Sequence, residues 1–140
     1  MNREIFFRGR SLSDGGWVYG DLEYERNKGL LSKVRIHTYK EDGRYDRQYL
    51  VESDTVGEFT GMKDKHGKEV FEGDIVEVHD FTSAYAGKYR GVVKIYRGSW
   101  CVEYFQTTFD TTFHPSLFFD DFADRKTEVI GNIHDNKDLL

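Results

Sequence analysis

Histidines and one cysteine are the residues of this 140-residue chain that could bind a metal or transfer a proton. The histidines are His37, His66, His79, His114 and His134. Their spacing matches no zinc site, and the single cysteine cannot supply a tetrahedral thiolate site within one chain. In the adjacent pairs His79-Asp80 and His134-Asp135, the two side chains would point to opposite faces of an extended backbone. We therefore expect solvated loop histidines rather than metal ligands or general bases.

Three aspartates, Asp120, Asp121 and Asp124, could bind a divalent cation or perform acid–base work. They flank three phenylalanines within residues 118–122, so a solvent-exposed face opposite an apolar stripe explains them better. Cys101 lies in a strand-like segment, where we expect a buried thiol, because a nucleophile needs a basic partner and partial exposure. The glycines within residues 57–73 are too widely spaced for a phosphate-binding loop. The sequence thus predicts no catalytic residue, no metal and no cofactor.

One stretch combines cations with aromatic side chains in a way that suits nucleic-acid binding. Its cations are Arg90, Lys94 and Arg97, and its aromatic residues are Tyr89, Tyr96 and Trp100. Small barrels can stack bases on aromatic rings beside such cations. Against this, the chain has 25 acidic and 20 basic residues and a net charge of −5, so it lacks the overall charge of a nucleic-acid binder. A smaller basic turn, Lys63 to Lys68, is diluted by Asp64 and Glu69. Nucleic-acid binding through the first stretch remains an alternative.

The elements that must position these residues are predicted to be mainly β-strands. Aromatic residues make up 16% of the chain, with 14 Gly and one Pro, which is typical of a turn-rich β protein. Residues 30–39 alternate apolar and basic side chains with period two, as in a half-buried strand. Residues 89–96 and 100–105 flank a glycine turn and predict a hairpin. At most one short helix is expected, near residues 116–122.

The stretch of residues 55–78 is punctuated by turns and marks a change of organisation along the chain. We expect residues 1–54 to form an N-terminal β subdomain that packs on a C-terminal subdomain of residues 55–140. A glycine-aspartate turn such as Gly73-Asp74, opening an apolar strand, is common where the sheet of a small SH3-like barrel bends.

Three blocks of the sequence resemble the YopX family, small proteins encoded largely by bacteriophages and prophages. They lie at residues 3–22, 55–76 and 128–140. The family-motif residues are Gly57, Phe59, Thr60, Gly61, Asp64, Gly67, Gly73, Asp74, Gly131 and Asn132. Lys137 departs from the family, which often has proline there. The resemblance implies a mainly β architecture with an SH3-like barrel in the C-terminal part, a structural role for the motif residues, and no established biochemical activity.

The expected function is therefore that of a phage- or prophage-derived, non-enzymatic protein that interacts with a protein partner or with itself. The runner-up is a nucleic-acid-binding accessory protein. A single cysteine rules out an internal disulfide and favours a reducing compartment. No apolar run approaches the roughly 18 residues of a membrane span, and the N-terminus lacks the long apolar region of a signal peptide. We expect a cytoplasmic protein, with no membrane association and no small-molecule substrate.

Overall fold

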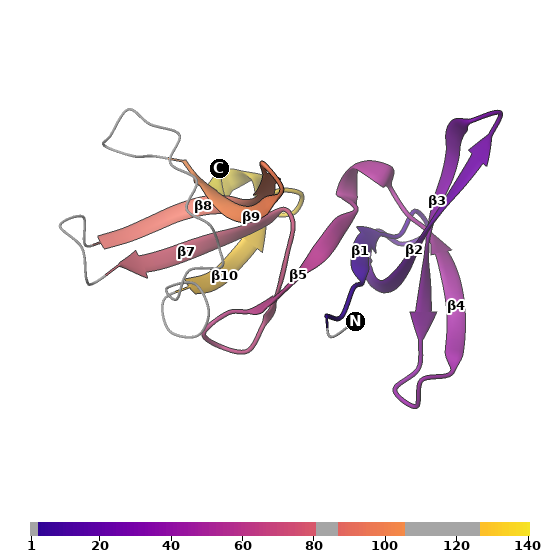
Figure 1. Ribbon diagram of the computed structural model, residues 1–140, viewed down its shortest axis with the longest axis horizontal. Coiled ribbons are helices and arrows are strands. Elements are labelled where there is room, and N and C mark those ends of the chain that lie inside the picture. Colours follow the sequence, from indigo (N-terminus) through magenta and orange to yellow (C-terminus); the bar gives the residue numbers. More distant parts are fainter. Residues whose placement is uncertain (1–2, 81–86, 106–126) are drawn as a thin grey trace. The chain divides into compact units, whose positions relative to one another are not determined.

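The computed structural model describes residues 3–80, 87–105 and 127–140, and this part of the chain is mainly β (Figure 1). The strands are β1 (Phe7–Arg10), β2 (Trp17–Asn27), β3 (Leu30–Tyr39), β4 (Tyr45–Leu50), β5 (Gly57–Lys63), β6 (Glu69–Phe71), β7 (Asp74–Asp80), β8 (Gly87–Tyr96), β9 (Ser99–Tyr104) and β10 (Thr127–Asn132). Two 3-10 turns, η1 (Ser53–Thr55) and η2 (Lys137–Leu139), complete the described elements. No helix among them has the length and hydropathy to span a bilayer. The helix predicted near residues 116–122 lies outside the described residues, as do His114 and the three aspartates.

The strands form two antiparallel sheets, which confirms the predicted β class. One has the order β4-β3-β2-β1-β5-β6 and the other the order β10-β7-β8-β9. By compactness the chain divides into an N-terminal unit, residues 1–59, and a C-terminal unit, residues 60–140. The predicted subdomain boundary, after residue 54, lies just before β5. The boundary between the two compact units, after residue 59, lies within β5.

The N-terminal unit is a meander built on the β2–β3 hairpin. Its turn residues, Lys28 and Gly29, both have positive φ (52° and 78°), the geometry that suits a two-residue hairpin turn. Val34 and Ile36 of β3 point into the core with Val51, as the period-two pattern predicted. On the opposite face, the guanidinium groups of Arg8 and Arg10 lie over the ring of Trp17, at 4.8 and 5.3 Å from its centroid.

Backbone hydrogen bonds also join the two ends of this meander. Leu12 N–H donates to Leu50 C=O and Glu52 N–H donates to Arg10 C=O, both over 2.9 Å, around a bridge between Ser11 and Val51. Four described strands of the C-terminal unit, β7 to β10, in contrast form an open sheet. They do not close into a barrel, and the SH3-like barrel remains a prediction.

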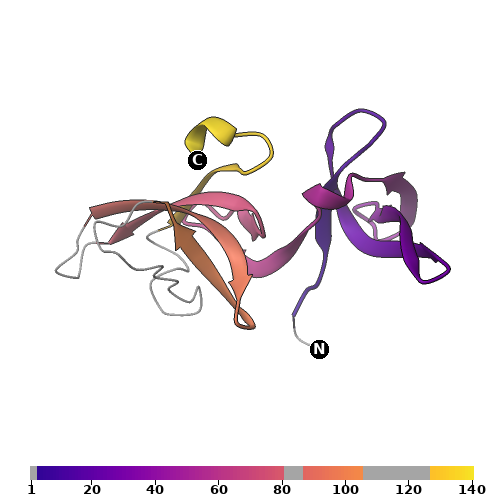
Figure 2. The same ribbon diagram turned by 90° about the horizontal axis from the view of Figure 1, so that it is seen from above.

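The C-terminal sheet has one apolar and one polar face. The apolar face packs around Val76, Val93, Trp100 and Val102, and Val70 of the β5–β6 hairpin joins the same cluster. The predicted hairpin of β8 and β9 is confirmed, with Tyr96 opposite Ser99 across a two-residue turn. Figure 2 shows this sheet and the C-terminal η2 turn from above. The opposite face, called the polar face below, carries the charged side chains considered next, together with the buried Ile75 and Cys101.

Candidate functional sites

Asp64 is the most connected of the family-motif residues. Its Oδ1 accepts hydrogen bonds from His66 N–H (2.8 Å) and Lys68 N–H (2.9 Å), and its Oδ2 accepts one from Val129 N–H (3.0 Å). The residue is only 4% exposed. Burial acts to raise the pKa of this carboxyl, but the three backbone donors outweigh it and hold the pKa below its ordinary value. Asp64 thus ties the turn after β5 to β10, 65 residues further along the chain.

Other central motif residues also bind backbone groups. Thr60 Oγ1 donates to Val70 C=O (2.8 Å) and accepts from Met62 N–H (3.2 Å). The buried Asp74 accepts from Phe71 N–H through Oδ2 (2.8 Å). Gly73, at φ 86°, donates to Val93 C=O (2.9 Å) and accepts from Ile133 N–H (3.0 Å). Gly61 and Gly67 also have positive φ, 85° and 79°. These residues set turns and join strands of the C-terminal unit.

The remaining motif residues lie at the start of β5, beside β1, and at the end of β10. Gly57 is buried opposite Arg8, and the ring of Phe59 lies 4.6 Å from that of Phe6. Asn132 Oδ1 accepts from His134 N–H and Asp135 N–H, each over 2.9 Å. Gly131 leaves room for the side chain of Asn136, which a Cβ at this position would meet. The motif therefore builds the scaffold at both places.

The polar face of the C-terminal sheet is organised around two glutamates, Glu77 of β7 and Glu128 of β10, which are direct cross-strand partners. Glu77 accepts from Arg90 Nε (3.0 Å), pairs with His79 Nε2 (3.0 Å) and lies 3.8 Å from Lys88 Nζ. The bonds from Arg90 and then His79 lower the pKa of Glu77.

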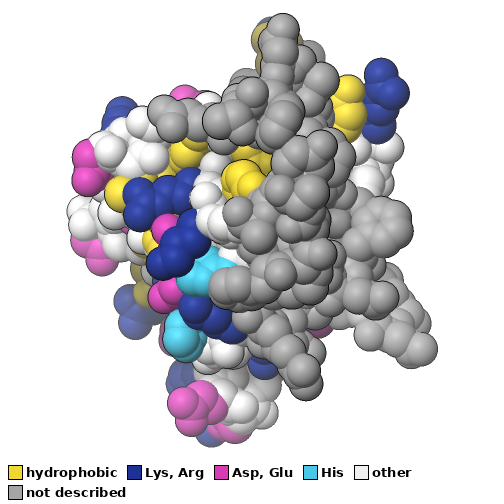
Figure 3. Space-filling view, turned by 90° about the vertical axis from the view of Figure 1, so that its left-hand side faces the viewer, with side chains coloured by type: hydrophobic (Ala, Val, Ile, Leu, Met, Phe, Trp, Pro, Cys, Tyr) yellow, Lys and Arg dark blue, Asp and Glu magenta, His cyan; other side chains and the backbone are white. Residues whose placement is uncertain are grey.

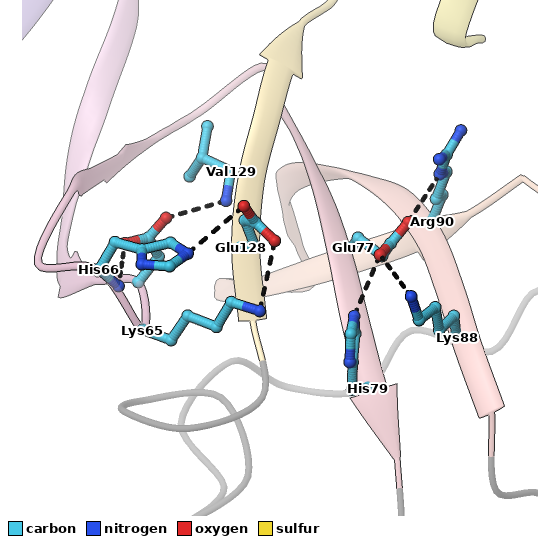
Figure 4. A network of polar contacts seen from close by, with 9 residues as sticks. Lys65, His66, Glu77, His79, Lys88, Arg90, Glu128 and Val129 are labelled. Carbon is cyan, nitrogen blue, oxygen red and sulfur yellow. Dashed lines mark hydrogen bonds and ion pairs between the residues drawn. The ribbon is translucent and has the colours of Figure 1, made fainter.

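Glu128 pairs with Lys65 and His66 (3.3 and 3.4 Å). Figure 4 shows each carboxylate surrounded by basic side chains, and Figure 3 shows Lys, Arg and His gathered on this side of the C-terminal unit. The basic groups offset the repulsion expected between opposed glutamates.

The predicted nucleic-acid stretch is divided between the two faces of this sheet. Arg90 and Lys94 share the polar face, and Lys94 pairs with Glu103 of β9. Arg97 lies in the turn, with its guanidinium 5.3 Å from the centroid of the Tyr96 ring.

Two of its aromatic residues, Tyr89 and Trp100, belong to the other face and do not line the cationic surface. Trp100 is 5% exposed in the core, and Tyr89 packs edge-on against Tyr104, 5.8 Å between centroids. The sequence prediction also missed Lys88 and the partner Glu77. Alternation of residues along β8 would have separated Tyr89 from Arg90.

Two histidines lie on strands: His37 within the strand predicted for residues 30–39, and His79 on β7, where a loop residue was expected. His37 pairs with Glu23 (3.3 Å) and with the hydroxyl of Tyr45 (3.1 Å), and a neighbouring Tyr39 hydroxyl donates to Asp21 (2.9 Å). That bond raises the pKa of Tyr39.

Among residues 3–80, 87–105 and 127–140, no group of three or more His, Cys, Asp and Glu is placed to hold a metal ion. Cys101 is buried as predicted, and burial raises the pKa of its thiol.

Exposed apolar side chains are concentrated in the N-terminal unit. Among the described residues, twelve large apolar side chains are exposed, and nine of them lie between Ile5 and Leu50. The most exposed is Leu30, at 74%. It sits at the tip of the β2–β3 hairpin with Leu31. The exposed Tyr24 lies further from the turn, opposite Val34, and Arg26 lies over its ring (5.7 Å).

The hairpin tip extends beyond the rest of its sheet. β1 pairs with β2 only at residues 17–20, and β4 pairs with β3 only at residues 35–39. Residues 25–27 and 30–33 therefore pair only with each other in the described sheet and form a free two-stranded arm (Figure 1). A second feature of this unit is a hollow of about 530 Å³. It is lined by Ser11, Leu12, Ser13, Arg35, Gln48, Tyr49 and Leu50.

Comparison with known proteins relates almost the whole chain to one family. The family model described as YopX protein matches residues 6–140. Among solved structures, the chain is similar to the crystal structure of protein EF1440 from Enterococcus faecalis, with 20% sequence identity, a TM-score of 0.54 and coverage of 99% of each chain. A likeness at this identity concerns the fold alone. A search of the curated proteins finds no match.

Proposed function

The chain belongs to the YopX family, as its three sequence blocks predicted, and on this premise we propose that it is a non-enzymatic, phage- or prophage-derived interaction protein. Its N-terminal unit binds a protein partner, including a second copy of itself, through the β2–β3 hairpin tip. The observation that carries the proposal is the exposure of Leu30 and Leu31 at the end of that free arm, with the exposed Tyr24 at its base. Exposed apolar side chains that lie near one another mark interaction sites more often than single exposed apolar side chains do.

The energetics of the hairpin tip support this role. Burying one leucine side chain stabilises a complex by about 1.5–3 kcal/mol, so two adjacent leucines can dominate the affinity of a small interface. The arm is ordered by its cross-strand register and its positive-φ turn, which limits the entropy lost on binding. Cations flank the leucines at Lys28 and Lys33, which favours a partner surface with an apolar pocket and an acidic rim.

The motif carboxylates support a non-enzymatic role. Asp64 and Asp74 are buried and accept hydrogen bonds from backbone N–H groups, a use that stabilises turns rather than chemistry on a substrate. A cytoplasmic location accompanies the proposal, because the single cysteine, Cys101, is a buried free thiol.

Replacing both tip leucines, Leu30→Ser with Leu31→Ser, is expected to weaken association at least tenfold while leaving the fold intact, since both side chains are exposed. Self-association is measured by size exclusion with light scattering, and binding of other proteins by affinity purification from the host cell followed by quantitative mass spectrometry. The matched control is Leu140→Ser, which removes an exposed leucine (60%) from the C-terminal unit and should change neither readout. A monomeric wild type that recovers no protein, or a double variant that binds like wild type, would refute the proposal.

A further inference from the structure

The polar face of β8 carries a row of cations at alternate positions. Lys88, Arg90 and Lys94 point to the same side of the strand, with Tyr96 at the end of the row. Alternate residues of an antiparallel strand repeat about every 6.8 Å, and Val92 occupies the position between Arg90 and Lys94, so the cations form a straight row with one gap. An extended polyanion is a ligand whose charges also lie along a line.

Lys88 and Arg90, rather than their shared acidic partner Glu77, are what a ligand meets first, whereas Lys94 (38% exposed) lies beside the equally exposed Glu103 (43%). The side chain of Glu77 is 13% exposed, whereas those of Lys88 and Arg90 above it are 68% and 52% exposed. In the described part of the chain, Arg90 makes one hydrogen bond, through Nε, out of the five N–H donors of a guanidinium. Lys88 lies 3.8 Å from the carboxylate, at the outer limit of an ion pair. The half-buried glutamate thus orders two exposed cations and leaves most of their donors for a ligand.

An exposed aromatic ring completes this row. Tyr96 is 40% exposed, and Arg97 extends its surface with a guanidinium over the ring. Aromatic rings beside cations bind single-stranded nucleic acid, because unpaired bases stack on the ring while phosphates contact the cations. Paired bases are held within a duplex and have no face to offer Tyr96, so the ring favours a single strand.

We propose that the polar face of β8 binds single-stranded nucleic acid, with phosphates on Lys88, Arg90 and Lys94 and a base stacked on Tyr96. This site lies in the C-terminal unit and is independent of the protein-binding role proposed for the β2–β3 hairpin tip. Compared with the stretch predicted from sequence, it gains Lys88 and loses Tyr89 and Trp100, which serve the core.

The test is anisotropy titration of a labelled oligothymidylate at several salt concentrations, beside a labelled duplex of equal length. The wild type is expected to bind the single strand more tightly, and the variant Lys88→Glu/Arg90→Glu/Lys94→Glu to lose at least tenfold in affinity. Three fewer phosphate contacts should reduce the slope of log affinity against log salt by about 2. Tyr96→Leu should cost roughly tenfold with an unchanged salt slope, because stacking carries no charge.

A charge-matched control separates a site from general electrostatics. Lys40→Glu/Arg47→Glu/Lys137→Glu makes the same change in net charge at exposed positions elsewhere and should bind like wild type. Glu103→Gln should bind about two- to fivefold more tightly, because it releases Lys94 from its surface ion pair. Absence of wild-type binding at low salt, equal losses in the two triple variants, or preference for the duplex would each overturn the proposal.

Discussion

Asp64→Ala is expected to lower the free energy of unfolding of the C-terminal unit by about 3–5 kcal/mol. The substitution leaves three backbone N–H groups, on His66, Lys68 and Val129, without their acceptor, and each unsatisfied buried donor costs about 1–3 kcal/mol. The loss is measured by urea unfolding followed by circular dichroism. The control is Asp138→Ala, an exposed aspartate, which should change stability by less than about 0.5 kcal/mol. A similar small change for Asp64→Ala would show that the turn and β10 hold together without this carboxylate.

The same carboxylate gives stability a pH dependence of known sign. Because the folded-state pKa of Asp64 is lowered, its ionised form stabilises the fold fully above the pKa of the unfolded chain, about 3.9. That contribution is lost as pH falls through the folded-state value. The difference in stability between wild type and Asp64→Asn should therefore be largest near neutral pH and narrow below about pH 4. A difference that is constant from pH 7 to 3 would contradict the assignment.

Gly20→Ala is the second substitution with a large expected effect, about 3 kcal/mol or more against the N-terminal unit. A Cβ on Gly20 would collide with the backbone carbonyl oxygen of His37, which no side-chain rotation can relieve. Gly20 pairs with Phe7 of β1, and the next residue of β2 begins the pairing with β3. The collision would therefore disturb both the β1–β2 and the β2–β3 pairing. Urea unfolding measures the loss.

Gly43→Ala distinguishes this collision from a general cost of replacing glycine. Gly43 has φ 86° and open space around its Cβ position, so alanine there should cost only about 1–2 kcal/mol, the strain of a left-handed backbone. Equal losses for the two variants would mean that β2 and β3 separate enough to admit a methyl group without further cost.

Much of the β architecture was predictable because it rests on local patterns. The alternation of residues 30–39 identified β3 and its buried positions, and the turn at Arg97-Gly98 identified the β8–β9 hairpin. The face on which Trp100 lies depended on register instead. A two-residue turn places Trp100 opposite Ile95 rather than Tyr96, and this one-residue difference moves it from the cationic face to the core.

Other parts of the candidate sites depended on contacts that no local pattern encodes. The bond from Val129 to Asp64 joins residues 65 positions apart, so the sequence marked Asp64 as a motif residue without showing what it holds. Leu30 and Leu31 belong to an apolar segment that resembles any buried strand. Their exposure follows from where β1 and β4 stop pairing with the hairpin, which is a property of the whole sheet.

The two tryptophans of the chain are divided between its units, one in each. Trp17 lies under two guanidinium groups and is half-buried, whereas Trp100 is enclosed by valines in the core. Their fluorescence should therefore differ, with blue-shifted emission from Trp100 and a longer wavelength and easier quenching by iodide for Trp17. The unmodified protein thus carries an optical reporter in each half, and emission at two wavelengths during denaturation can follow the loss of each unit separately.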